Sequence, residues 1–192
     1  MKVYSVFLPD LKQRPHLIAR YEALLSDAET ERYRQMRDDL RRLQFLAGRA
    51  VIQAVCHQSP RLLTNGKPVV DKGYISLAHS GPYVLLAVGD SPVGIDIEDA
   101  SKQKDFDRLA ARLNFHLSGE KKRSFYEQFT RYEATYKLGE NRGNCACFYY
   151  SIDTFIVCII TLNKNEKIEF INTLPFELEI PFTPTFSGQE TQ

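Results

Sequence analysis

Apolar and polar residues follow two different periods along this chain. Residues 2–8 alternate as in a half-buried strand. Ser26 and Glu29 then form a capping-box pattern, which predicts the start of a highly charged helix. From Asp38 onwards, apolar residues return at steps of three and four, which predicts a longer amphipathic helix. This first part of the chain is therefore predicted to form one strand and then two helices.

Three strand-like segments follow at 74–79, 83–89 and 92–98. An Asn-Gly pair followed by Pro68 predicts a bend in the chain just before them. The turn sequences SGP and GDSP separate the three segments from one another. We therefore expect these strands to form an antiparallel meander.

The pattern becomes helical again at 105–115 and at 118–139, with Ser118 as the expected N-cap of the second helix. From about 146 to 182 the chain becomes rich in strand-forming residues, in the segments FYYSIDTFIVCIITL, KIEFI and FELEI. Helices segregated from antiparallel strands in this way indicate an α+β fold.

Each half of the chain runs from helices into a group of strands, which suggests two similar lobes. We expect a single compact chain with an N-terminal lobe at about 1–99 and a C-terminal lobe at about 100–182. Residues 183–192 are polar and rich in proline and threonine, so we expect this tail to fray.

The composition is that of ordinary globular sequence, with 43% hydrophobic and 26% charged residues among 192. A formal net charge of +1 argues against nucleic acid as a partner of the whole surface. One segment is nevertheless basic, and this local patch could bind phosphates. Its arginines are Arg32, Arg34, Arg37, Arg41, Arg42 and Arg49.

The sequence gives no sign of secretion or of a membrane anchor. The N-terminal apolar run is too short for a signal peptide, and no segment approaches the roughly 18 apolar residues of a membrane span. Cys145 and Cys147 have the look of half a metal site, but no Cys/His pair follows at zinc-finger spacing, which favours core thiols in a reducing compartment. We expect a soluble cytoplasmic protein with no membrane partner.

The segment VGIDIED, residues 93–99, carries the most unusual charge pattern. Residues two apart in a strand point to the same face, so Asp96 and Glu98 would lie side by side and repel each other. A positive charge between the two carboxylates would relieve that repulsion. Solvated carboxylates on an exposed strand face are the simpler alternative, and the sequence pattern leaves both open.

A second candidate group lies on the helix predicted at 118–139. Glu133 and Lys137 are four residues apart and would share one helix face. Alone, such a pair is most often a surface ion pair. Together with Asp96 and Glu98, however, Glu133 would suit Mg²⁺, which prefers carboxylates supplemented by substrate phosphate oxygens. Basic residues elsewhere, above all Arg32, Arg49 and Lys67, would then be available for further phosphates; His79 alone is a weak signal.

Five motifs, in this order, resemble those of one enzyme family. They are FLAGR (45–49), NGKP (65–68), SLAHS (76–80), VGIDIE (93–98) and FTRYEATYK (129–137). The set resembles the 4′-phosphopantetheinyl transferases of the larger, surfactin-synthetase-activating (Sfp) type. The likeness covers residues 26 to 137, and the length and the β-rich ending also agree with it.

This resemblance implies a monomer of two similar α+β lobes related by a pseudo-twofold axis, with coenzyme A in the cleft between them. Enzymes of the family transfer 4′-phosphopantetheine from coenzyme A to a serine hydroxyl of an apo acyl or peptidyl carrier protein. The other product is adenosine 3′,5′-bisphosphate. Such chemistry depends mostly on positioning and charge neutralisation.

The family's roles can be carried over to individual residues. Asp96, Glu98 and Glu133 would hold Mg²⁺ at the diphosphate of coenzyme A. Glu133 would also take the serine proton, directly or through a metal-bound water. Lys137 would steady the transferring phosphoryl group or the leaving diphosphate. The remaining roles concern the nucleotide. Lys67, beside Pro68, would lie along the adenine, and the 3′-phosphate would be bound by His79, Arg32 and Arg49.

Five positions depart from the family pattern, and one of them is Phe129, where the family usually has a tryptophan. Tyr132 stands where the family usually has a lysine before the catalytic glutamate, so that positive charge is missing. Glu29, Gln44 and Ala78 replace a basic residue, an arginine and a serine, respectively. These departures motivate one alternative, a family member that binds coenzyme A or a carrier protein without catalysis. The second alternative is a nucleic-acid-binding module built on the arginine-rich helix. The near-neutral net charge disfavours it.

Overall fold

The computed structural model describes residues 1–63, 66–139, 144–173 and 189–190. The chain divides into two compact units, Met1–Asp90 with Lys167–Phe182 and Ser91–Glu166 with Thr183–Gln192. Helices and mostly antiparallel strands occur in both units, so the fold is α+β, as the sequence predicts. Each unit is described below by itself.

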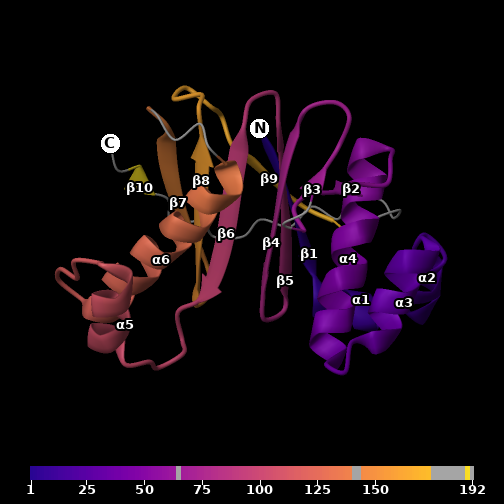
Figure 1. The fold of residues 1–192 in the computed structure, drawn as a ribbon, viewed down its shortest axis with the longest axis horizontal. Helices are drawn as coiled ribbons and strands as arrows, with labels where there is room; N and C mark the ends of the chain where they lie inside the picture. The colour runs from indigo at the N-terminus through magenta and orange to yellow at the C-terminus, as the bar shows by residue number, and fades with distance from the viewer. Residues whose placement is uncertain (64–65, 140–143, 174–188, 191–192) are drawn as a thin grey trace. The chain divides into compact units, whose positions relative to one another are not determined.

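The first unit is built on a four-stranded sheet with the order β4-β5-β1-β9 (Figure 1). Strand β9 pairs with β1 in parallel, and the other pairs are antiparallel. A two-stranded sheet of β2 and β3 completes the strands described in this unit. The elements are β1 (Lys2–Phe7), α1 (Leu8–Lys12), α2 (Pro15–Glu22), α3 (Asp27–Gln35), α4 (Asp39–Cys56), β2 (Arg61–Leu62), β3 (Pro68–Val69), β4 (Tyr74–Ser80), β5 (Tyr83–Gly89) and β9 (Glu169–Asn172).

Helix α4 supplies much of the core of this unit. Leu46 and Ala50 of its apolar stripe are fully buried and belong to one cluster with Val84 and Leu86 of β5. The predicted helix starts are confirmed: the Asp38 side chain accepts from the backbone N–H of Arg41, and α3 opens at a capping box. Burial of the apolar face accounts for most of the stability of such a helix.

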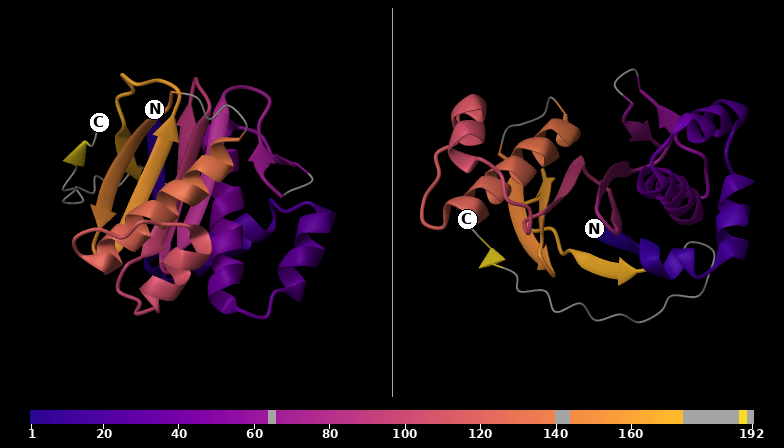
Figure 2. Two further views of the ribbon diagram at one scale, coloured as in Figure 1. Left: turned by 60° about the vertical axis from the view of Figure 1, so that its left-hand side comes forward. Right: turned by 90° about the horizontal axis from the view of Figure 1, so that it is seen from below.

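The second unit contains a sheet with the order β10-β7-β8-β6, all antiparallel. Figure 2 shows α6 running across one face of this sheet, where it packs on β6 and β8. Apolar residues of α5 and α6, among them Ala110 and Phe125, form a further cluster with Ile156 of β8. The elements are β6 (Val93–Asp99), α5 (Phe106–Leu113), α6 (Lys121–Leu138), β7 (Ala146–Ile152), β8 (Phe155–Thr161) and β10 (Gln189–Glu190).

Two local predictions are wrong. The expected three-stranded meander ends after β4 and β5, because β6 pairs with β8 and belongs to the other sheet. Ser118 is not the N-cap of α6, which begins at Lys121 with Glu120 as its N-cap. The backbone N–H of Ser118 instead donates to the hydroxyl of Ser124, so the chain before α6 makes a turn of its own.

The expected lobe boundary near residue 99 stays a prediction. Strand β6 lies within the unit that starts at Ser91. The expected strand FELEI and most of the tail at 183–192 lie outside the described residues, except that Gln189–Glu190 pair with β7.

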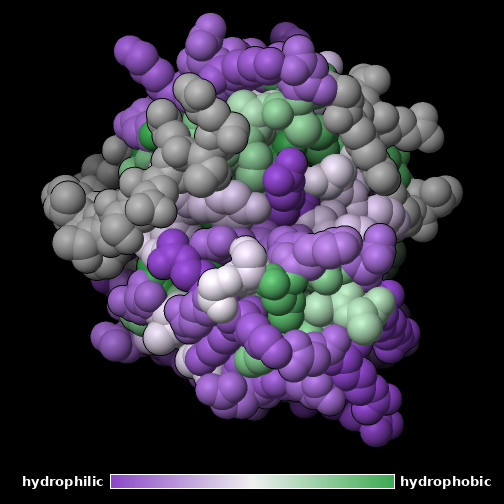
Figure 3. All heavy atoms as spheres, turned by 90° about the vertical axis from the view of Figure 1, so that its left-hand side faces the viewer, coloured by the Kyte–Doolittle hydropathy of each residue, from purple (hydrophilic) through white to green (hydrophobic). Residues whose placement is uncertain are grey.

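Polar surface dominates the view in Figure 3, where hydrophobic side chains gather in small areas between hydrophilic ones. Among the residues that the structure describes, no helix is both long enough and apolar enough to cross a membrane.

Candidate active site

Strand β6 places Asp96 and Glu98 on the face of the sheet that α6 covers. Asp96 lies directly opposite Cys158 of β8, and the buried side chain of Cys158 packs in one cluster with Ala134 of α6. Ile95 and Ile97 point to the opposite face because strand residues alternate. The predicted shared face of the two carboxylates is therefore confirmed, although helix α6 covers it and water does not surround it.

Gly94 allows α6 to lie close to β6 at this point. A Cβ atom on Gly94 would overlap the carbonyl oxygen of Ala134 and would lie 2.9 Å from the backbone nitrogen of Leu138. Backbone atoms inside a helix cannot give way as a flexible side chain can. The glycine of the GIDIE motif is thus required by packing, and it brings the helix that carries Glu133 and Lys137 onto the acidic strand.

Lys137 makes the most direct contact between helix and strand. Its Nζ donates to Oδ1 of Asp96 at 2.7 Å and to the carbonyl oxygen of Ile95 at 3.1 Å. Asp96 is only 7% exposed, and its other oxygen, Oδ2, is buried with no hydrogen-bond partner in the described part of the chain. An unpaired buried carboxylate oxygen is costly, so this atom is a candidate ligand for a cation.

The carboxylates of the site disfavour one another's ionisation. Burial raises the pKa of Asp96 to about 6, Lys137 opposes the rise, and the charges of Glu98 and Glu133 add to it. Burial also raises the pKa of Glu98. The positive charges of Lys104 and Lys102 oppose this rise, and the negative charge of Glu133 adds to it. A bound cation would relieve this excess of negative charge.

Glu133 is thus close enough for its charge to act on both carboxylates of β6. It lies half-buried on α6, one turn before Lys137, as the sequence predicts. Among the described residues, however, no three His, Cys, Asp or Glu side chains are grouped closely enough to hold a metal ion. The three acidic residues therefore form one charged cluster without a ready-made coordination sphere.

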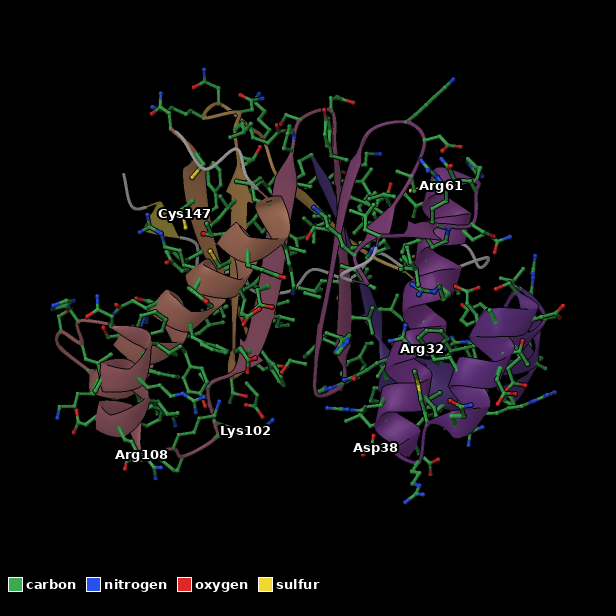
Figure 4. All side chains as sticks on the ribbon, in the orientation of Figure 1. Arg32, Asp38, Arg61, Lys102, Arg108 and Cys147 are labelled. Atoms are coloured by element: carbon green, nitrogen blue, oxygen red, sulfur yellow. The ribbon has the colours of Figure 1, made fainter. Side chains whose placement is uncertain are left out.

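Sequence reasoning missed two lysines of this cluster. Lys102 and Lys104 lie in the segment between β6 and α5, and their charges act on Glu98. Figure 4 labels Lys102 in this segment. Lys104 Nζ also lies 5.1 Å from the ring centroid of Tyr126, whose hydroxyl donates to the carbonyl oxygen of Lys102. The available signal was the pair of lysines in the segment SKQK, which lies just after the acidic strand.

The raised pKa of Asp96 gives a prediction about stability. The folded protein holds the Asp96 proton more tightly than the unfolded chain, whose pKa is near 3.8. The stabilisation of the fold by this tighter proton binding at Asp96 is therefore complete below the unfolded pKa. It is lost as pH rises through about 6. Without added metal, the free energy of unfolding of the wild type relative to Asp96→Asn should fall by about 3 kcal/mol between acidic and neutral pH.

Urea unfolding at a series of pH values measures this difference. Asp99→Asn is the matched control: burial raises the pKa of Asp99, but hydrogen bonds from Ser101 and Thr154 outweigh it and the pKa is lowered. The contribution of Asp99 to the free energy of unfolding is thus lost as pH falls. The difference between wild type and Asp99→Asn should therefore rise with pH, opposite to that for Asp96→Asn. A flat or rising difference for Asp96→Asn would contradict the account of the buried carboxylate.

A group of basic residues lies in the first unit, around the ring of Phe45. The guanidinium carbon of Arg49 is 4.8 Å from the ring centroid of Phe45, and that of Arg32 is 5.5 Å from it. Figure 4 labels Arg32, which α3 contributes to the group. Two of the predicted phosphate-binding residues are thus brought together by α3 and α4.

The contacts of Glu29 explain why this position differs from the family pattern. Its Oε2 accepts from the backbone N–H and hydroxyl of Ser26, and its Oε1 lies 2.6 Å from Nε of Arg49. Burial lowers the pKa of Arg49, and the charge of Glu29 opposes that shift. The carboxylate therefore caps α3 and also neutralises a buried guanidinium, a role that a basic residue could not fill.

The other predicted nucleotide-binding residues lie on the strands of this unit. Pro68 begins β3, and His79 lies exposed on β4 opposite Val84 of β5. Burial lowers the pKa of Lys67, which precedes β3. Of the predicted nucleotide-binding residues, the structure brings Arg32 and Arg49 together around the ring of Phe45.

Gln44 and Ala78 have structural roles at the positions where they depart from the family pattern. Gln44 is buried on α4, and its Nε2 donates to the carbonyl oxygen of Gly81 in the turn between β4 and β5. Ala78 is buried on β4 opposite Leu85. Gln44 thus ties α4 to the turn that closely follows His79.

Comparison with known proteins identifies one relative of interest. The chain is 31% identical over 116 residues to the 4′-phosphopantetheinyl transferase psf-1 of Bacillus pumilus, a match that covers 52% of this chain and 48% of the relative. The chain is similar to a phosphopantetheinyl transferase. It spans about half the length of this curated relative. No protein-family model matches the chain.

Proposed function

We propose that this protein transfers 4′-phosphopantetheine from coenzyme A to a serine hydroxyl of an apo carrier protein, with Mg²⁺ as the cofactor. The observation that carries the proposal is the acidic cluster of Asp96, Glu98 and Glu133, in contact with Lys137 through Asp96. The similarity to psf-1 supports the reaction class. The proposed products are a holo carrier protein and adenosine 3′,5′-bisphosphate.

The donor atoms of this cluster suit a hard divalent cation. Carboxylate oxygens are preferred ligands of Mg²⁺, and Asp96 Oδ2 is buried without a partner in the described part of the chain. Three prearranged protein ligands are not needed, since Mg²⁺ commonly takes one or two carboxylates together with phosphate oxygens and water. We propose Asp96, Glu98 and Glu133 as the residues that hold it. Bound there, the ion would neutralise charge on the diphosphate of coenzyme A.

The chain's own residues would handle the proton and the phosphoryl charge. We propose that Glu133 accepts the proton of the carrier serine as the hydroxyl attacks phosphorus. Lys137, whose ammonium group lies at the acidic cluster, would stabilise negative charge on the transferring phosphoryl group or on the leaving diphosphate. General-base assistance of this kind is typically worth about 10²–10⁴-fold in rate.

The basic residues of the first unit would bind the nucleotide. Arg32 and Arg49 share the ring of Phe45, and Arg49 is held by Glu29. We propose that these arginines and His79 bind the 3′-phosphate, and that Lys67, with Pro68, lies along the adenine. Arg49 is neutralised by its carboxylate partner, so Arg32 would contribute more of the positive charge.

Release of adenosine 3′,5′-bisphosphate tests the reaction. The purified protein, coenzyme A and Mg²⁺ are mixed with a panel of apo carrier proteins from fatty-acid, polyketide and peptide synthesis. We expect product release with at least one carrier and none without a carrier. Measurable coenzyme A binding with no release on any carrier would favour the second candidate, a protein that binds without catalysis.

Tyr132 is the residue that favours this second candidate. Its side chain is 51% exposed on α6, and its ring packs against that of Phe115 in a T-shaped arrangement with centroids 6.1 Å apart. This contact lies at the surface, so a long basic side chain can replace it at little cost in stability.

We therefore expect Tyr132→Lys to keep the turnover of the wild type or to raise it by up to about tenfold, since the lysine adds positive charge beside Glu133. Steady-state kinetics with the best carrier of the panel measure the effect, and Tyr136→Lys, one turn further on the same helix and also exposed, is the control. A collapse of turnover in Tyr132→Lys alone would show that the tyrosine itself has been recruited to the site.

A further inference from the structure

Two cysteines of the second unit form a close pair of free thiols. Cys147 Sγ on β7 and Cys158 Sγ on β8 are 3.3 Å apart, a distance at which one thiol donates a hydrogen bond to the other. Figure 4 labels Cys147 on its strand. Both thiols face α6, within the cluster that also contains Ala134 and Leu138. None of the roles proposed above uses this pair.

The two thiols differ in accessibility and in chemical character. Cys147 is partly exposed, whereas Cys158 is fully buried. The hydrogen bond with Cys158 lowers the pKa of Cys147 to about 7, against the effect of burial, and Tyr149 and Arg131 lower it further. A thiol with these properties is the more reactive member of a pair, because the thiolate is the nucleophile.

We propose that Cys147 and Cys158 are a reversible oxidation site, at which a peroxide converts the two thiols into an intrachain disulfide. The sulfur of Cys147 attacks one oxygen of the peroxide, breaks the O–O bond and becomes a sulfenic acid, while water leaves. The thiol of Cys158 then attacks that sulfur, and the second water leaves. Both electrons lost by the thiols go to the peroxide, which is fully reduced to water.

The register of β7 and β8 makes this disulfide readily reducible. Cys147 lies opposite Ile160 and Cys158 opposite Tyr149, so the two cysteines are diagonal neighbours. Diagonal residues in an antiparallel pair are about 7–8 Å apart, which is at or beyond the usual Cα separation of a disulfide. The bond would form with some displacement of the strands, and strained disulfides are the labile ones.

Oxidation at this place would reach the acidic cluster. Cys158 lies directly opposite Asp96 in the β6–β8 pair, and both side chains lie under α6. A shift of Cys158 toward Cys147 would move the strand that supports Asp96. This consequence rests on the proposed function: transfer should slow several-fold on oxidation and recover on reduction.

Peptide mapping by mass spectrometry tests the oxidation site without reference to activity. The native protein is treated with a modest excess of hydrogen peroxide, alkylated and digested. We expect a Cys147–Cys158 linkage, with Cys56 and Cys145 still alkylated, and its complete loss on treatment with dithiothreitol. Without the partner thiol, in Cys158→Ala, Cys147 should stop at a sulfenic acid that dimedone traps.

Cys145→Ser is the matched control, because Cys145 borders the same cluster, whereas the sulfur 3.3 Å from that of Cys158 belongs to Cys147. The linkage should form in this variant as in the wild type. A native wild-type protein whose Cys147 goes to sulfinic acid without any linkage would overturn the proposal, as would a linkage through Cys145 or Cys56. If the linkage forms but no carrier is modified in either redox state, the oxidation site stands and the proposed function fails.

Discussion

Alanine in place of Asp96 or of Glu133 is expected to lower the rate of transfer by about 10³-fold or more, because each change removes a ligand or a base from the proposed site. The fold should survive both changes. Asp96→Ala removes a carboxylate whose ionised form is disfavoured by burial. The side chain of Lys137, which loses its partner, is 27% exposed and can be solvated by water instead. Glu133 is only half-buried.

Turnover at saturating coenzyme A and carrier, with Mg²⁺ varied, measures this loss, and thermal unfolding confirms that each variant is folded. Asp99→Ala provides the matched control. It removes a neighbouring carboxylate of the same strand. This carboxylate faces the other side of the sheet and accepts hydrogen bonds from Ser101 and Thr154. If Asp96→Ala or Glu133→Ala turns over at nearly the wild-type rate at limiting Mg²⁺, the metal-binding site is wrongly assigned.

Gly94→Ala is expected to destabilise the fold by about 3 kcal/mol or more, since the added methyl group must displace the backbone of α6. The overlapping atom is the carbonyl oxygen of Ala134, in the middle of a helix that packs on β6 and β8. Moving α6 away would also separate Glu133 and Lys137 from Asp96, so transfer should fall along with stability.

Gly48→Ala is the comparison that isolates the cause. A Cβ there would lie 2.9 Å from Cδ2 of Leu77, the end of a flexible side chain, and Gly48 lies within α4. Better helix propensity offsets the local crowding, so the change should stay within about 1 kcal/mol of the wild type. Chemical denaturation measures both variants; equal losses at the two positions would show that close packing of α6 on β6 is not the reason for Gly94.

Short-range patterns in the sequence predict much of the local structure. The capping box at Ser26, the start of α4 after Asp38 and the strands β4, β5 and β6 are all confirmed. Each of these depends on neighbouring residues alone: a side chain that caps a helix, or apolar positions that alternate along a strand.

Pairing between distant segments could not be predicted in the same way. The turn sequence before β6 correctly separates it from β5, but it does not specify the partner of β6, which is β8, more than 50 residues further along the chain. Strand β9 likewise joins β1 in parallel. Such choices depend on which apolar faces bury each other in the whole fold, which no local period records.

The candidate site shows the same division. The alternation in VGIDIED predicts the shared face of Asp96 and Glu98, and helical spacing predicts that Glu133 and Lys137 share a face. The contact between Lys137 and Asp96, the unpaired Oδ2 of Asp96 and the pairing of Arg49 with Glu29 arise from tertiary packing. The oxidation site at Cys147 is likewise visible only once β7 lies beside β8.

The intact mass of a carrier protein gives the most direct test of the central claim. An apo carrier is incubated with this protein, coenzyme A and Mg²⁺, beside the same carrier with its acceptor serine replaced by alanine. We predict that the first carrier gains the mass of one phosphopantetheine group, that the second gains none, and that chelation of Mg²⁺ prevents the gain. An unchanged mass for every carrier tested, while the protein binds coenzyme A, would contradict the proposed transfer.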